Sequence, residues 1–135
     1  MGVPEGAIVI IGCFCSYIIS QGIKNLIDLT KGKFSIKDIL EHGGMPSSHT
    51  ATVAALVFGI FFAKGVTTEL AISLVLAAVV VADALGVRRN VGRIALTVNR
   101  FHHSKHCTEQ GHSFPQVVMG GILGAIVSIL TWLIF

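Results

Sequence analysis

The stretch Leu70–Val87, LAISLVLAAVVVADALGV, is almost entirely apolar and carries a single charged residue. A helix that crosses a bilayer needs about 20 predominantly apolar residues, with a range of roughly 17–25. The chain has three further apolar blocks, at Gly6–Ile23, Thr50–Ala63 and Phe114–Phe135. The shortest, Thr50–Ala63, reaches spanning length if Ser47–His49 forms its entry turn. The sequence therefore predicts an all-α integral membrane bundle of about four transmembrane helices.

The composition favours the same fold class. Of the 135 residues, 53% are hydrophobic and 13% are charged, and the mean hydropathy is +0.78. A soluble domain carries about 25% charged residues. We expect residues 1–135 to form a single membrane-embedded domain. The three cysteines give no disulfide framework.

Two polar loops, Lys24–Gly44 and Arg88–Ser113, lie on the same side of the membrane if there are four spans. The turn Lys64–Glu69 and both termini then lie on the other side. Nine of the ten Lys and Arg residues fall on the loop side, and the positive-inside rule places that side in the cytoplasm. The chain is thus expected to be a multi-pass cell-membrane protein with a cytoplasmic loop face. Basic residues that hold a phosphate would produce the same asymmetry, so the orientation stays open.

The second loop contains an amphipathic pattern. Apolar residues recur at spacings of three and four, and Arg93 and Arg100 lie between them. This predicts a short helix in the membrane interface, beside a lipid substrate. A helix that caps the bundle is the alternative. The apolar positions are Val91, Ile94, Ala95, Val98 and Phe101.

In the last apolar block, Gly120 and Gly124 have the spacing of a helix-packing motif. We expect this small-residue face to pack within the chain. Four short helices make a thin bundle, so a homo-oligomer is also compatible with the sequence.

The stretch Gly43–Thr50, GGMPSSHT, carries the first candidate site. The glycines permit a close approach of the backbone to a ligand, and Pro46 with the serines is typical of a helix start capped by serine. The N-terminus of a helix binds oxyanions through its free N–H groups and its dipole. His49 lies in the first turn of that helix. The alternative is a glycine-rich turn with a structural histidine.

A second histidine, His112, opens the last helix on the same side of the membrane, and cations accompany both helix starts. One histidine could attack phosphorus while the other protonates the leaving oxygen, and the cations would stabilise the equatorial oxygens. The cations of this group are Lys24, Lys31, Arg88, Arg89 and Arg93.

Asp83 is a carboxylate within a predicted span, where such a group is costly and by default functional. An ion pair with an active-site arginine is the favoured role, before a catalytic or metal-binding role or a structural cap. A cluster in the second loop also permits a zinc hypothesis, because His102 and His106 have ligand spacing. We expect no metal and no cofactor. The cluster consists of His102, His103, His106, Cys107 and Glu109.

Three motifs together make the sequence resemble the divergent branch of the type 2 phosphatidic acid phosphatase superfamily. Gly43–His49 resembles its G-G-M-P-S-S-H motif, Asp83–Arg89 its D-A-x-G-V-R-R motif, and Gly111–Pro115 its G-H-x-P motif. The segment from Lys24 to Lys31 is similar to the start of the superfamily motif K-x6-R-P. Lys31, Gly32 and Ser48 stand where the superfamily motifs have arginine, proline and glycine. Two further differences bear on the mechanism: His106 replaces an arginine, and Gln116 replaces the carboxylate that orients the nucleophile.

The resemblance implies a role for each matching residue. His112 would be the nucleophile that forms a phosphohistidine, and His49 the general acid for the leaving alcohol. Gln116 would accept a hydrogen bond from the nucleophile without supplying charge, unless Glu109 or Asp83 takes that role. The phosphate would be held by Lys24, Lys31, Ser47, the Ser48 amide, and Arg88 or Arg89.

The resulting expectation is a phosphoric monoester hydrolase that acts on a membrane phospholipid phosphate, of the phosphatidylglycerophosphate or phosphatidic acid type. A polyprenyl pyrophosphate phosphatase is an alternative substrate class. A carrier of anionic lipid headgroups without turnover is the non-enzymatic alternative, and a metal transporter is a third. No nucleic-acid partner is expected.

Overall fold

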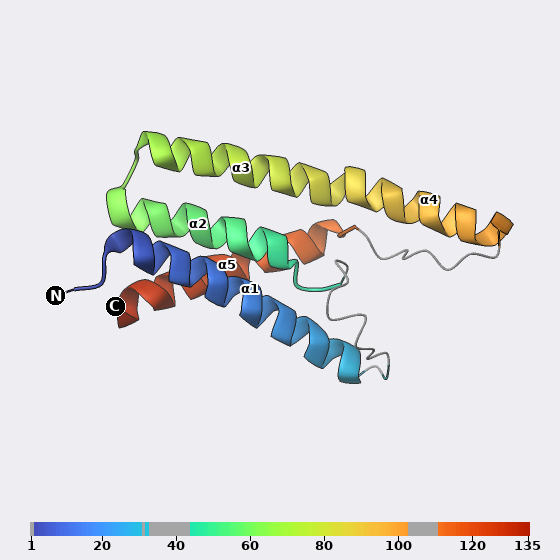
Figure 1. Ribbon diagram of the computed structural model, residues 1–135, viewed down its shortest axis with the longest axis horizontal. Helices are drawn as coiled ribbons and strands as arrows, with labels where there is room; N and C mark the ends of the chain where they lie inside the picture. Colours follow the sequence, from blue (N-terminus) through green and yellow to red (C-terminus); the bar gives the residue numbers. More distant parts are fainter. Residues whose placement is uncertain (1, 31, 33–43, 103–110) are drawn as a thin grey trace.

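The computed structural model describes residues 2–30, 32, 44–102 and 111–135, and every regular element in these ranges is an α-helix. The helices begin and end at α1 Glu5–Thr30, α2 Ser48–Lys64, α3 Thr68–Leu85, α4 Val87–His102 and α5 Phe114–Ile134. The α2–α3 turn and the two termini lie at one end of the bundle (Figure 1). The starts of α2 and α5 lie towards the other end, as the four-helix arrangement predicted.

Three helices in the described ranges are long and apolar enough to cross a membrane. They are α1, the nearly continuous α3–α4 segment Thr68–Phe101, and α5. Helix α2 is apolar but has 17 residues, the lower limit for a span. The all-helical membrane fold is therefore confirmed, as three candidate spans and one shorter apolar helix.

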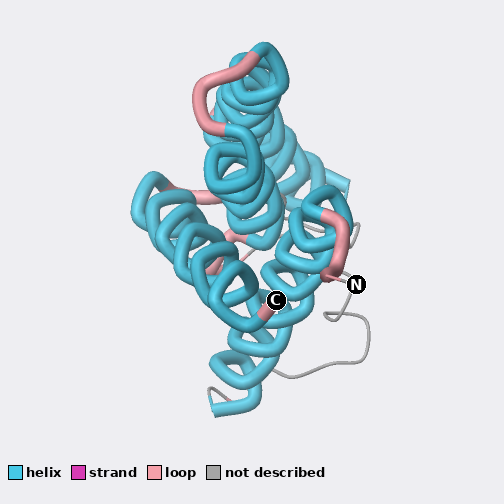
Figure 2. The backbone as a smooth tube through the Cα atoms, turned by 90° about the vertical axis from the view of Figure 1, so that its left-hand side faces the viewer, coloured by secondary structure: helices cyan, strands magenta, loops and turns pink. Residues whose placement is uncertain are grey.

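Helix α2 is central to the bundle, because it packs against α1, α3 and α5. Seen from the end that holds the termini, the helices lie side by side in a bundle and are joined by loops (Figure 2). The interior combines apolar residues such as Val127 with small polar ones, among which Ser16 and Ser20 are fully buried. Large apolar side chains such as Phe14 and Leu133 are exposed instead. This distribution suits a lipid surround, where helices associate through small residues rather than through a hydrophobic core.

The glycine pair of α5 forms the closest contact between α2 and α5. A Cβ atom at Gly120 would overlap the carbonyl oxygen of Ser47, and one at Gly124 would overlap that of Ala51. Gly121, between them, has only ordinary contacts with Thr50. The prediction that this face packs within the chain is confirmed.

One predicted boundary was wrong. The first apolar block was expected to end at Ile23, but α1 continues to Thr30 and includes Lys24. Leu26, Ile27 and Leu29 favour helix, so the backbone stays helical past the apolar boundary. Lys24 is therefore a helix residue and not a loop residue.

The amphipathic helix of the second loop is present as α4. It continues the direction of α3 and extends beyond the rest of the bundle (Figure 1). Among the described helices, it packs only against α3. The alternative of a helix that caps the bundle is therefore wrong. Its apolar positions Val91, Ile94 and Phe101 are exposed, as expected of a helix that meets lipid.

Candidate active site

The start of α2 is a tight turn built by its own sequence. Gly44 has a φ of 93°, a conformation that favours glycine, and the Met45–Pro46 peptide bond is cis. Ser47 is the N-cap: its Oγ accepts the Thr50 N–H at 3.5 Å and the Thr50 hydroxyl at 3.0 Å. The predicted serine cap is confirmed. Because Ser47 is fully buried, its side chain shapes the turn from within.

Lys24 reaches this turn from α1. The side chain is only 6% exposed, and its Cε atom would lie 3.1 Å from a Cβ atom at Gly44. Glycine at position 44 thus gives the lysine stem room to pass. A buried ammonium beside a helix N-terminus adds positive charge where an oxyanion would bind.

Two backbone hydrogen bonds join the three motifs. The Ser47 N–H donates to the Gln116 carbonyl at 3.2 Å, which ties the start of α2 to the first turn of α5. The His112 N–H donates to the Ala84 carbonyl at 3.2 Å, which ties the segment before α5 to the end of α3. Gly111 lies so close to the Arg89 backbone that a Cβ atom would overlap it. The structure therefore brings the described parts of the three motifs, residues 44–49, 83–89 and 111–115, to one place.

His112 is almost fully buried at this place. Its side chain is 3% exposed and lies near two cations, Lys24 and Arg88. Burial lowers the pKa of His112, and the two nearby cations lower it further. Hydrogen bonding towards Gln116 and the Gly44 backbone acts in the opposite direction. The imidazole is therefore kept neutral at neutral pH, the form that a nucleophile needs.

Gln116 is occupied by the helix start. Its Oε1 accepts the Ser113 N–H at 2.7 Å, one half of a capping box for α5. The Gln116 side chain lies close enough to favour a charged His112, yet the Nδ1 atom of His112 has no well-formed hydrogen bond within the described residues. The well-formed hydrogen bond of the Gln116 side chain is the one from the Ser113 N–H, which gives Gln116 a capping role. Its orientation of the imidazole stays a prediction.

Asp83 forms an ion pair with Arg88, through Oδ2 and Nε. The predicted ion pair between this carboxylate and an arginine is thereby confirmed. Both side chains are 36% exposed, so the pair lies at the edge of the site. The carboxylate holds the guanidinium, which leaves the remaining N–H donors of Arg88 for an anion.

The other predicted residues lie as follows. Ser48 is buried and His49 is half-buried in the first turn of α2, while Arg89 is exposed. Lys31, His106 and Glu109 lie outside the described residues, as does most of the loop cluster proposed for zinc. No group of three His, Cys, Asp or Glu side chains suited to a metal occurs within the described ranges.

Sequence analysis missed the contacts that assemble the site. The Ala84 and Gln116 carbonyls hold the three motifs together, and no side-chain pattern reveals a carbonyl partner. The close contact of Gly111 could have been predicted, because a glycine next to a candidate site histidine is typical of a close backbone approach.

Comparison with known proteins agrees with these motifs. The model of the Divergent PAP2 family matches residues 6–127. The chain belongs to the Divergent PAP2 family. A Bacillus subtilis (strain 168) protein described as "Uncharacterized membrane protein YuiD" is 34% identical over 93 residues, which cover 67% of this chain. The match spans 59% of that relative's length. No solved structure matches the chain.

The family match covers all three motifs of this Divergent PAP2 protein, from Gly43 to Pro115. The resemblance of these motifs to the divergent phosphatidic acid phosphatase branch is therefore a family relationship. The relative is itself a membrane protein by its description, in agreement with the apolar helices found here.

Proposed function

We propose that this Divergent PAP2 protein is a membrane-embedded lipid-phosphate phosphatase that hydrolyses a phosphomonoester through a phosphohistidine. The observation that carries the proposal is the pair of backbone hydrogen bonds, Ser47 to Gln116 and His112 to Ala84, which join the three motifs. They unite a neutral buried histidine, a second histidine in a helix first turn, and cations from two helices.

In the first step, the neutral His112 imidazole attacks phosphorus, and the bond from phosphorus to the lipid oxygen breaks. His49 gives its proton to the departing alkoxide, so the lipid leaves as an alcohol. Lys24, Arg88 and the first-turn N–H groups of α2 would stabilise the charge on the equatorial oxygens. In the second step, His49 accepts a proton from water, which attacks the phosphohistidine and releases inorganic phosphate and free His112.

The substrate class follows from where the site lies. It is at the end of three apolar helices, so the phosphate of a membrane lipid would reach it from the interface. We propose the cell membrane as the location and the cytoplasm as the side of the site, from the excess of Lys and Arg on the loop side. A cytoplasmic site favours a phospholipid monoester, phosphatidylglycerophosphate or phosphatidic acid. The opposite orientation would favour a polyprenyl pyrophosphate.

One observation favours a second candidate function. Gln116 carries no charge, and its carbonyl already accepts the Ser113 N–H. A site without a carboxylate behind the nucleophile could bind a phosphate headgroup without turning it over. The protein would then be a carrier or binding protein for anionic lipids.

The deciding experiment measures phosphate release by the purified protein in detergent. The panel contains phosphatidic acid, phosphatidylglycerophosphate and undecaprenyl pyrophosphate, each with and without EDTA. Turnover of a lipid monoester that resists EDTA and is inhibited by vanadate supports the proposal. Saturable binding of the same lipids with no phosphate release would favour the carrier, and complete inhibition by EDTA would contradict the metal-free route.

A further inference from the structure

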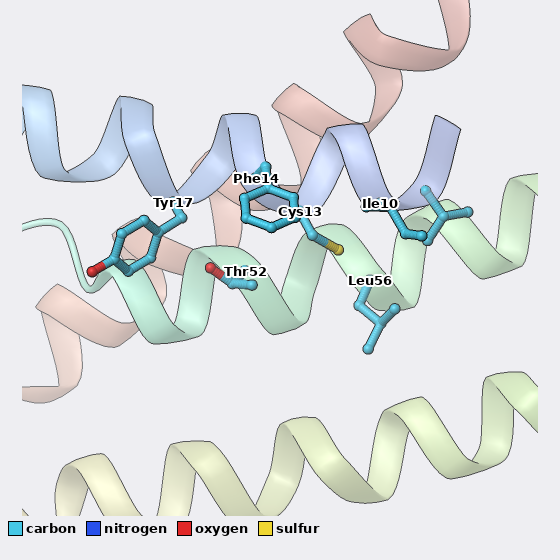
Figure 3. A pocket seen from close by; sticks show the side chains of 7 residues that line it. Ile10, Cys13, Phe14, Tyr17, Thr52 and Leu56 are labelled. Atoms are coloured by element: carbon cyan, nitrogen blue, oxygen red, sulfur yellow. The ribbon is translucent and has the colours of Figure 1, made fainter. Parts of the chain in front are cut away.

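A groove lies on the bilayer side of the candidate site, between α1 and α2. It has a volume of about 490 Å³, within the range of small-molecule sites. Figure 3 shows side chains of α1 facing α2 across it. The groove is lined by Val9, Ile10, Cys13, Phe14, Tyr17, Thr52 and Leu56.

The surface that lines the groove is apolar. The one aliphatic hydroxyl, that of Thr52, donates to the Ser48 carbonyl at 2.9 Å and needs no other partner. Tyr17 lies at the end of the groove nearest the start of α2 (Figure 3), where an amphipathic aromatic ring suits the membrane interface. The groove therefore fits a hydrocarbon chain.

The groove is in line with the phosphate site. On α1, Lys24 follows Tyr17 by about two helical turns and Cys13 by about three, so the three share one face. On α2, His49 precedes Thr52 by about one turn and Leu56 by about two, again on one face. A ligand that follows the groove towards the loop end therefore arrives between the lysine and the histidine.

The dimensions agree with a lipid tail. From Tyr17 to Val9 the groove follows α1 for roughly 12 Å, at a rise of about 1.5 Å per residue. One leaflet contributes roughly 15 Å of hydrocarbon, half of a core of about 30 Å. The groove thus covers most of the depth that one acyl chain occupies.

We propose that this groove holds one acyl chain of the lipid phosphate whose headgroup lies between Lys24 and His49. The inference rests on the proposed function for the headgroup and adds the tail. Because the chain is held along α1 and α2, its position sets the depth of the phosphate relative to His112. Substrates with chains long enough to reach Leu56 are preferred over short-chain analogues with the same headgroup.

The first test fills the groove without touching the phosphate site. Cys13→Trp and Leu56→Trp are compared on dioleoyl and dihexanoyl phosphatidic acid, since a hexanoyl chain occupies far less of the groove than an oleoyl chain. Displacement of a reacting group by about 1 Å costs up to about 10²-fold, so kcat/KM for the dioleoyl lipid should fall about tenfold or more. The value for the dihexanoyl lipid should stay within about twofold of wild type.

Two controls separate filling from general damage. Cys13→Ala removes the thiol without filling the groove, and Ile18→Trp places the same bulk on an exposed α1 position that does not line it. Both should keep the wild-type ratio of the two substrates. Equal losses on both substrates in the filled variants, or the same selective loss in Ile18→Trp, would overturn the proposal.

A second measurement does not depend on turnover. Phosphatidic acid with a photoreactive diazirine near the end of one chain is irradiated with the protein in phosphatidylcholine vesicles. Adducts should concentrate on Ile10, Cys13 and Leu56, and excess dioleoyl phosphatidic acid should remove them while dioleoyl phosphatidylcholine does not. Groove adducts in a wild type without phosphatase activity would uphold the groove and reject the phosphatase. Adducts spread evenly over exposed positions such as Ile72 and Leu133 would reject the groove.

Discussion

The starts of α2 and α5 lie side by side and are built in opposite ways. At α2 the cap is a serine that precedes the helix, and His49 follows it inside the first turn, half-buried. At α5 the N-cap is Ser113, whose N–H donates to the Gln116 side chain inside the helix, and His112 precedes the cap, 3% exposed. The difference supports the different roles proposed for the two histidines. Burial favours a neutral nucleophile at α5, and partial exposure permits proton exchange at α2.

The largest expected effect comes from removing either histidine. His112→Ala should reduce kcat by about 10⁴-fold or more, since a nucleophile has no substitute. His49→Ala should reduce it by about 10²–10⁴-fold, the usual contribution of a general acid. The measurement is phosphate release at saturating lipid, with size-exclusion profiles as the check on folding. Near-native turnover in either folded variant would contradict the role assigned to that histidine.

The next effect tests the contact that holds the two helix starts together. Gly120→Ala places a Cβ atom against the Ser47 carbonyl, and such overpacking costs about 1–3 kcal/mol. Its Tm in detergent should fall, and turnover should fall with it because Ser47 and Gln116 move apart. Gly121→Ala is the matched control, since the added Cβ meets only Thr50 at 3.9 Å. Equal Tm values for the two variants would show that the close approach is unimportant.

A smaller effect tests the asymmetry of the caps. Gln116→Glu keeps an acceptor for the Ser113 N–H and adds a negative charge near His112. The charge would stabilise the imidazolium as phosphorus is attacked, so kcat should rise about tenfold, a fraction of the roughly 10⁴-fold attributed to the carboxylate of a related triad. Gln116→Leu, which lacks the acceptor, should lower Tm instead. An unchanged rate in Gln116→Glu would indicate that another acid already serves His112.

The smallest effect concerns pH. Because the pKa of His112 is lowered, the acid limb of kcat/KM should lie below pH 6.5, the approximate value for a free histidine. The free energy of unfolding should also decrease at acid pH. As pH falls below about 6.5, the unfolded chain binds the proton more readily than the folded one, which favours unfolding. In Gln116→Glu the added charge raises the pKa of His112, and the acid limb should move up. An acid limb above pH 7 in the wild type would contradict a neutral, buried nucleophile.

The helices illustrate how far the sequence predicts this fold. The apolar blocks identified α2, α3 and α5 closely, and the amphipathic spacing identified α4. The end of α1 was placed too early, because the apolar block stops at Ile23 while residues that favour helix continue to Thr30. Hydropathy reports where lipid ends, and a helix need not end there.

The candidate site shows the same division. Its histidines, its serine cap and the Asp83–Arg88 pair were predicted from motifs and from the cost of a carboxylate in a span. The capping use of Gln116 was not predicted. A side chain at N3 can serve either the helix backbone or a neighbouring ring, and only the positions of both decide which.

By itself, the sequence determined the membrane class, the helix starts and the residue types available for phosphate chemistry, because hydropathy and capping act over a few neighbouring residues. The tertiary structure alone decided that Ser47 meets Gln116, that His112 meets Ala84, and that an apolar groove lies between α1 and α2. These contacts join segments tens of residues apart. They depend on how closely the helix backbones approach at Gly120 and Gly124, a distance that no local pattern encodes.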